Sequence, residues 1–305
     1  MIPSERSKIK GNFAAASMMF IFGIDAPIMK SVLPDWINAF GLVSLRMCLA
    51  AVAALLLSFF FEKEHVTKKD KFLLILAALF GILFNQGGIT IGVQYSSPID
   101  VGIIVTTTPV IVLLLSRVFK HVRIGRWNIW GILAGMAGVL LLLFLGGTAK
   151  GSTQQNTFIG NLIVVCGMVS YGLYLTFAAS VLSRYSIITL MKWIFGFAAL
   201  FSLPIGLKDL LEAPAFTQLA PWTVYLRLAF SGLGATFGAF MLNMIAMKCI
   251  KGRTIAMYGY LQPLITAIIA VIAGQARLTV VNVISAIFIL AGVYMATLAE
   301  KRKSN

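Results

Sequence analysis

The residues that could do chemistry in this sequence are mostly single ionisable side chains inside long apolar runs. Asp25 is the one carboxylate well inside such a run, and Arg46 lies in the middle of the next run. At about 1.5 Å of rise per helical residue, both reach a similar depth in a core about 30 Å thick, so an ion pair is geometrically feasible. Ionisable groups at this depth are functional candidates by default. Two interpretations stay open: a structural ion pair between the two helices, or Arg46 as the contact for a substrate carboxylate, which suits a guanidinium.

If the chain moves a solute across a membrane, Asp25 is also the candidate for coupling that movement to a proton gradient. Coupling requires a group inside the membrane that binds and releases a proton. Substrate competing for Arg46 would free Asp25 to take up a proton, and this links the two events. The alternative is uniport, with Asp25 only neutralising Arg46.

Further polar side chains in the apolar runs are candidates for the wall of a binding site. Lys192 lies about one and a half turns from a helix end, so it either contacts substrate or extends to the interface. Lys30 is expected to extend to the outer interface in the same way. The other substrate-binding candidates are Asn85, Gln86, Tyr171, Tyr174, Tyr258 and Gln262.

Two prolines interrupt apolar runs at matching places. Pro109 and Pro263 cannot bond the carbonyls four residues earlier, those of Val105 and Gly259. A free carbonyl at membrane depth needs another partner or a water-lined cavity. We expect both prolines to act as hinges or cavity walls; a simple packing kink is the alternative.

Enzyme chemistry would require a cluster of titratable groups, and the sequence has none. It has no phosphate-binding glycine motif and no zinc-ligand spacing, and its two histidines lie in gaps between apolar runs. The net charge of +15 does not indicate nucleic-acid binding, because the basic residues also lie in the gaps. We therefore expect no catalytic residue, no metal and no cofactor; the expected partners are a small-molecule substrate and the lipid bilayer.

The elements that carry these residues are membrane-length helices. The chain of 305 residues is 59% hydrophobic and 11% charged, against about 25% charged in a soluble domain. Uninterrupted apolar runs of about 20 residues favour helices over a barrel. The sequence predicts ten spans, at 13–32, 38–61, 71–94, 98–119, 127–147, 158–180, 186–207, 222–246, 253–274 and 279–299.

The distribution of Lys and Arg predicts the orientation. With the N-terminus inside, 18 basic residues fall on the cytoplasmic side and four fall outside. Cytoplasmic loops carry the excess of Lys and Arg. We expect a multi-pass protein of the cell (inner) membrane with both termini in the cytoplasm.

The chain repeats itself. At a shift of 154 residues, Pro109 falls on Pro263, and the tripeptide at 137–139 falls on that at 291–293. At a shift of 149, Gly23 falls on Gly172. Residues 1–150 and 151–305 therefore form two five-helix repeats of one transmembrane domain. Because five is odd, the second repeat enters the membrane from the opposite side, which gives an inverted repeat.

Ten helices, a 5+5 inverted repeat and a proline-centred fourth helix in each half resemble the EamA-like family of the drug/metabolite transporter superfamily. The most recognisable stretches run from Pro109 to Val139 and from Pro263 to Val293; Arg123 and Arg277 stand without the Gly-Glu that is common before this position. The resemblance implies a secondary transporter, often an exporter, of an amino acid or another small metabolite. Alternatives are a passive channel or uniporter and, less favoured, a membrane-embedded lipid-handling enzyme.

Overall fold

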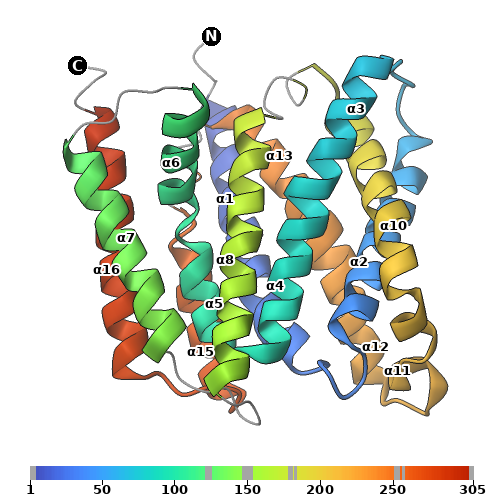
Figure 1. Cartoon of the computed structure of the whole chain (residues 1–305). Helices are drawn as coiled ribbons and strands as arrows, with labels where there is room; N and C mark the ends of the chain where they lie inside the picture. The colour runs from blue at the N-terminus through green and yellow to red at the C-terminus, as the bar shows by residue number, and fades with distance from the viewer. Residues whose placement is uncertain are drawn as a thin grey trace.

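The computed structural model describes residues 5–120, 126–145, 154–177, 181, 184–250, 255 and 258–301 (Figure 1). Every regular element in these ranges is helical, as the composition predicts. Arg123, quoted above for the family resemblance, lies outside the described residues.

The helices follow the predicted apolar runs closely, because a segment inside a bilayer must satisfy its backbone hydrogen bonds internally. They are α1 (Glu5–Lys30), α2 (Ala39–Ser58), α3 (Lys68–Ala77), the π-helical segment η1 (Ala78–Leu83), α4 (Phe84–Tyr95), α5 (Pro98–Val105), α6 (Thr108–Lys120), α7 (Arg126–Leu145), α8 (Gln154–Phe177), α10 (Ile187–Leu211), α11 (Pro214–Thr217), α12 (Trp222–Ala229), the π-helical segment η2 (Phe230–Gly238), α13 (Ala239–Cys249), α15 (Leu261–Ile272) and α16 (Val280–Lys301).

Six described spans are long and apolar enough to cross a membrane. They are α1, α2, α3 to α4, α8, α10 and α12 to α13. A seventh candidate consists of α5 and α6, which meet at a bend of 41°. The apolar parts of α7, α15 and α16 are shorter. Each predicted run thus coincides with a helix, but membrane-spanning length is reached by six of them, or seven with the bent pair.

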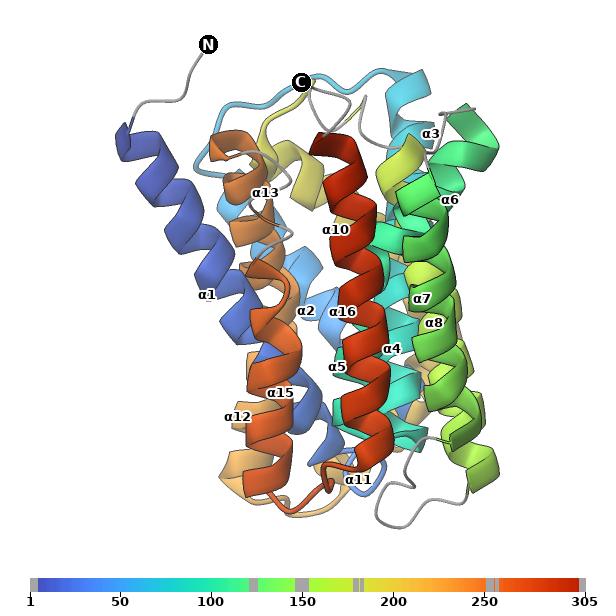
Figure 2. The same ribbon diagram turned by 90° about the vertical axis from the view of Figure 1, so that its left-hand side faces the viewer.

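The long helices stand side by side and alternate in direction along the chain (Figures 1 and 2). α1 begins and α16 ends at the same end of the bundle, which we call the terminal end; the other is the far end. α1 runs toward the far end, whereas α8 runs toward the terminal end. The main helix pairs are α7 with α16, α2 with α10, α4 with α8, and α1 with both α13 and α15.

Close backbone contacts between α7 and α16 come in a reciprocal pair. A Cβ atom added to Gly138 would lie 2.7 Å from the carbonyl oxygen of Ser285. One added to Gly292 would lie 2.5 Å from the carbonyl oxygen of Gly131. A shift of 154 residues converts each contact into the other.

The contact between α1 and α15 corresponds in the same way to the contact between α8 and α6. A Cβ at Gly23 would lie 2.8 Å from the side chain of Ile265, and one at Gly172 would lie 2.9 Å from that of Ile111. Gly23 corresponds to Gly172 and Ile111 to Ile265 in the sequence repeat. A larger residue at either position would require the facing side chain or backbone to shift.

Each half also contains one π-helical segment, η1 or η2, inside a long apolar run. A wider helical turn leaves backbone carbonyls without their usual partner. Hydroxyl groups bind two of them: Ser170 Oγ donates to the carbonyl of Phe80 at 2.8 Å, and Thr236 Oγ1 donates to that of Ser231 at 2.8 Å. Asn85 is the second residue after η1, so this segment influences its direction.

Candidate functional site

The Arg46 guanidinium lies at the centre of the bundle and is fully buried. Its Nη2 atom is 3.0 Å from Asp25 Oδ2 and 3.0 Å from Gln86 Oε1. The other N–H groups donate to Thr236 Oγ1 at 2.9 Å, Thr90 Oγ1 at 3.1 Å and Met29 Sδ at 2.8 Å. All five donors of the guanidinium therefore have a partner.

This geometry confirms the predicted contact between Asp25 and Arg46. The second oxygen of Asp25 is also occupied, because Ser231 Oγ donates to Asp25 Oδ1 at 2.8 Å. Removing one member would leave the other as an uncompensated buried charge. In this conformation Arg46 serves the ion pair, and a substrate carboxylate could bind it only by displacing a protein partner.

A central cavity of about 470 Å³ lies beside this pair. Its size falls within the range of small-molecule sites, about 300–1,000 Å³. Predicted site residues in its lining are Asp25, Asn85, Gln86, Pro109, Tyr171 and Gln262. The predictions missed Asn243 and Tyr260, and also the methionines in the lining, Met18, Met19, Met29, Met168 and Met247.

The remaining predicted side chains lie outside the described lining. Arg46 is behind Asp25 and Gln86. Tyr174 stacks on Tyr171, with ring centroids 5.6 Å apart, and faces Gly81.

Three further predicted residues are placed elsewhere. Tyr258 packs in a small apolar cluster with Ala14 and Ala15. Lys192 is half-buried, and Pro263 lies in the first turn of α15. Pro263 was predicted as a hinge from its match to Pro109, and Tyr258 and Lys192 were predicted from their positions along the helices. Such positions do not indicate which neighbour each helix face meets.

Pro109 is placed as predicted, beside a break between α5 and α6. The carbonyl of Val105, which Pro109 cannot bond, accepts from Thr108 Oγ1 at 2.7 Å. The preceding threonines bind carbonyls in the same way, Thr106 to Ile103 and Thr107 to Ile104. The three threonines thus satisfy the end of α5. For Pro263 the first turn of a helix needs no N–H donor, so the described part of α15 continues through it.

The cavity extends toward the terminal end and is closed at the far end. Met247 in the last turn of α13 and Ile255 line it on the terminal side.

At the far end Lys30 Nζ donates to the carbonyls of Val93 at 3.0 Å, Gln94 at 2.9 Å and Ser96 at 3.1 Å. The last carbonyls of a helix lack partners and form its negative end, which suits an ammonium group. Lys30 therefore ties α1 to α4, whereas the sequence analysis expected it to extend to the interface.

Two amide side chains add to this closure. Gln94 Oε1 accepts from the backbone N–H of Ala39 at 2.8 Å, and Gln275 Nε2 donates to the carbonyl of Pro27 at 2.9 Å. Contacts at the far end thus join α1, the start of α2, the end of α4 and the segment after α15.

The sequence analysis missed a second buried carboxylate, Asp100, in the first turn of α5. Its two oxygens accept from Asn282 Nδ2 and, at 3.4 Å, from Asn161 Nδ2; Ser96 Oγ is 3.5 Å away. Ser97 caps the same helix by accepting from the Asp100 N–H at 3.0 Å. The capping pattern from Ser97 to Asp100 and the lone asparagines in two apolar runs were the signals available in the sequence.

No group of three or more His, Cys, Asp or Glu side chains that could hold a metal ion occurs among the described residues. The polar groups that line the cavity are one carboxylate, amides and hydroxyls.

Comparison with known proteins agrees with this architecture. The chain is 25% identical to the uncharacterized transporter YetK of Bacillus subtilis over 293 residues, covering 94% of this chain and 86% of the relative. It is 22% identical to the uncharacterized transporter YoaV of the same organism, covering 97% of this chain and 99% of the relative. An uncharacterized transporter of Archaeoglobus fulgidus is 25% identical, covering 86% and 88%.

Among the solved structures that match the fold, a crystal structure aligns with a TM-score of 0.61 at 20% identity, covering 99% of this chain and all of the other. The sequence profile of the EamA-like transporter family matches twice, at residues 9–144 and 158–298. The two matches correspond to the two halves of the sequence repeat. This membrane protein belongs to the EamA-like transporter family.

Proposed function

We propose that the protein is a secondary transporter that moves a small metabolite by alternating access through the central cavity. The observation that carries the proposal is a cavity of about 470 Å³ beside a buried ion pair, closed at one end by Lys30 and extending toward the other end. A carrier needs a central site that is blocked from one side at a time.

The proposal includes ten transmembrane helices in a 5+5 inverted repeat, residues 1–150 and 151–305. The reciprocal glycine contacts support it, since Gly138–Ser285 and Gly131–Gly292 exchange under the sequence repeat. The two π-helical segments and the two family matches add support. The opposite directions of α1 and α8 also support the inverted repeat (Figure 1).

We assign the terminal end to the cytoplasm of the inner membrane. The motivating observation is the basic-residue bias, 18 inside against four outside. With this assignment the cavity extends toward the cytoplasm, which suits the loading state of an exporter. Reporter fusions after Lys71 and Arg126 should report the cytoplasm, and one after Thr153 the outside. A cytoplasmic signal from the Thr153 fusion would break the inverted-repeat assignment.

For the substrate we propose an amino acid or a related small metabolite. Asp25, Asn85, Gln86 and Asn243 face the cavity, so a substrate ammonium or amide group finds acceptors there. The five methionines supply an adaptable apolar surface for a side chain. A substrate carboxylate would be bound by the cavity amides, or by Arg46 after Gln86 has moved away.

We further propose that Asp25 is the proton-coupling group. It lines the cavity while bonded to Arg46 and Ser231, so substrate binding can change its partners. The coupling would be asymmetric, because the repeat counterpart, Tyr174, is not acidic.

Transport assays in proteoliposomes test the function. We expect flux that saturates with substrate concentration, and counterflow, in which unlabelled substrate inside drives uptake of labelled substrate. A panel of amino acids and related amines and carboxylates is the practical starting set. Flux that never saturates, without counterflow, would indicate a passive channel instead.

A further inference from the structure

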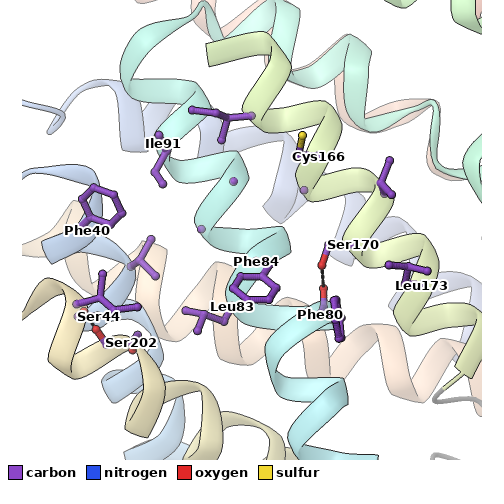
Figure 3. A pocket seen from close by; sticks show the side chains of 17 residues that line it. Phe40, Ser44, Phe80, Leu83, Phe84, Ile91, Cys166, Ser170, Leu173 and Ser202 are labelled. Atoms are coloured by element: carbon purple, nitrogen blue, oxygen red, sulfur yellow. Dashed lines mark hydrogen bonds between the residues drawn. The ribbon is translucent and has the colours of Figure 1, made fainter. Parts of the chain in front are cut away.

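A second hollow, the lateral groove, lies on the side of the bundle between the α2–α10 pair and the α4–α8 pair (Figure 3). Its volume is about 520 Å³. Phe40 and Ile205 form one wall, Ile163 and Cys166 form the other, and Phe84 and Ile91 lie between them.

Tight packing inside each helix pair explains why space remains between the pairs. On α2, a Cβ added to Gly41 would lie 3.0 Å from the backbone of Asp209 on α10. On α4, a Cβ added to Gly88 would lie 3.2 Å from Gly167 Cα on α8. Small residues let backbones approach closely. Between the pairs, by contrast, large side chains such as Phe84 line the groove.

The lining of the lateral groove carries no charged residue and no free hydroxyl group. Ser44 Oγ donates to the carbonyl of Ser202 at 2.8 Å, and Ser202 Oγ donates to that of Ala199 at 3.2 Å. Ser170 Oγ donates to the carbonyl of Phe80, as Figure 3 shows. An occupant therefore gains apolar contact and no hydrogen bond from these side chains.

The groove opens to the lipid. Phe40, Phe84 and Ile205 are 47%, 50% and 60% exposed, on helices of membrane-spanning length. A narrow apolar groove that faces a bilayer, without hydrogen-bond donors or charge, fits a hydrocarbon chain. We propose that the lateral groove is a lipid site that holds one acyl chain of a bilayer phospholipid.

The site is separate from the central cavity but shares α4 with it. Gly87 and Gly88 line the groove, whereas Asn85 and Gln86 line the cavity. The contact between Asn85 Nδ2 and the carbonyl of Gly167, at 3.1 Å, lies between the two spaces. An acyl chain would thus pack against the face of α4 opposite to the one that carries Asn85 and Gln86.

Gly87 provides a test, because a Cβ atom added there would meet nothing within 4 Å. A larger side chain at this position would enter the groove without disturbing a packed helix contact. Gly196 on α10 is the matched control: it also has nothing within 4 Å and does not line the groove.

The experiment reconstitutes the full chain in nanodiscs with a phosphatidylglycerol that carries a diazirine in the middle of one acyl chain. After photolysis, peptide mapping locates the adducts. We expect them to concentrate at residues 80–91 and 163–173, at Cys166 among others. Their yield should fall about tenfold in Gly87→Leu and stay unchanged in Gly196→Leu.

Adducts spread evenly over all lipid-facing helices, or equal yields in Gly87→Leu and the parent, would overturn the proposal. So would an efficient Cys166–Cys166 crosslink between two chains, because the occupant would then be a second copy. Should Gly87→Leu fail to fold, Ile205→Trp fills the groove from the opposite wall and carries the same expectation. None of these readouts depends on transport, so the lipid site can fail while the proposed function stands.

Discussion

Three described carboxylates are buried, Asp25, Asp70 and Asp100, and the first and last of these are kept buried in different ways. Asp25 is 4% exposed and bonded to the Arg46 guanidinium at 3.0 Å. Asp100 is fully buried and receives hydrogen bonds from the amides of Asn161 and Asn282. No described cation lies within ion-pair distance of Asp100.

The difference follows from their positions along the helices. Asp100 lies in the first turn of α5, where the unpaired backbone N–H groups and the helix dipole favour a negative charge. Asp25 lies within α1, where no such groups are available, and a full counter-charge replaces them. Asp25 also lines the cavity, whereas Asp100 does not. The comparison therefore separates a carboxylate that can respond to substrate from one that holds helices together at the far end.

The largest effect on stability is expected when Arg46 is removed. Arg46→Met would leave Asp25 buried without its cation, and breaking a buried pair costs about 3–5 kcal/mol of unfolding free energy. Thermal unfolding in detergent micelles measures the loss. The matched control is Lys192→Met, which removes a half-buried cation outside the cavity lining and should change the midpoint little.

A double variant sharpens this prediction. Asp25→Asn with Arg46→Met removes both charges and should be more stable than Arg46→Met alone. A double variant that is less stable than either single variant would show that the charges do not compensate each other.

The next effect concerns Asp25 and function. Asp25→Asn leaves the Arg46 charge buried without its counter-charge but with its four other hydrogen-bond partners, so we expect a stability loss at the lower end of the range for a broken buried pair, about 3 kcal/mol. We also expect transport in proteoliposomes to stop responding to an imposed pH gradient. Uptake measured with and without the gradient, for parent and variant, gives the answer. A parent that ignores the gradient, or an Asp25→Asn variant that still follows it, removes Asp25 as the coupling group.

For Asp100 we expect a smaller loss of stability and no loss of coupling. Asp100→Asn keeps one acceptor oxygen but turns an amide N–H toward Asn161 or Asn282, at a cost of about 1–2 kcal/mol. The same gradient assay is the readout. If Asp100→Asn abolished the gradient response while Asp25→Asn retained it, the roles assigned above would be reversed.

The smallest change is expected at Lys30. Lys30→Met removes three hydrogen bonds to the end of α4, and because the side chain is half-buried we expect about 1 kcal/mol of destabilisation. The sharper readout is access from the far end. Ala26 lines the cavity, so a cysteine introduced there can report access. In the Lys30→Met background, Ala26→Cys should react faster with an impermeant thiol reagent added on that side than it does in the parent background.

Lys208→Met is the matched control for Lys30, because it removes an exposed lysine in the last turn of α10 near the same end. Equal labelling rates at Ala26→Cys in both backgrounds would mean that the Lys30 contacts do not close the cavity.

Depth was the part of the site that the sequence predicted well. The fixed rise of a helix placed Asp25 and Arg46 at one level, and their contact follows from neighbouring antiparallel helices. The unpaired carbonyl of Val105 was likewise predicted from the position of Pro109 alone, and in the structure Thr108 Oγ1 donates to it. Ten apolar runs likewise sufficed to predict an all-helical chain.

Spacing along the sequence did not predict which neighbour each helix face meets. It also did not predict contacts between residues far apart in the chain. Tyr174 has the depth of a cavity residue, yet its face of α8 meets Gly81. Asp100 was overlooked because its partners are 61 and 182 residues away along the chain. The contact of Arg46 with Thr236 depends on the π-helical segment η2, for which the apolar run gives no local signal.

The reciprocal contacts of Gly138 and Gly292 have a mechanical consequence for α7 and α16. Where side chains of two helices interdigitate, one helix moves past the other only if ridges leave their grooves, which favours jumps of a whole turn. At Gly292 the backbone faces only the backbone of Gly131 and Gly135, so there is no ridge to lift out there, whereas at Gly138 the side chain of Ile289 also meets the glycine. Under the proposed alternating access, the contact at Gly292 could therefore tilt by small steps without separating, which suits this part of the α7–α16 pair to be a pivot.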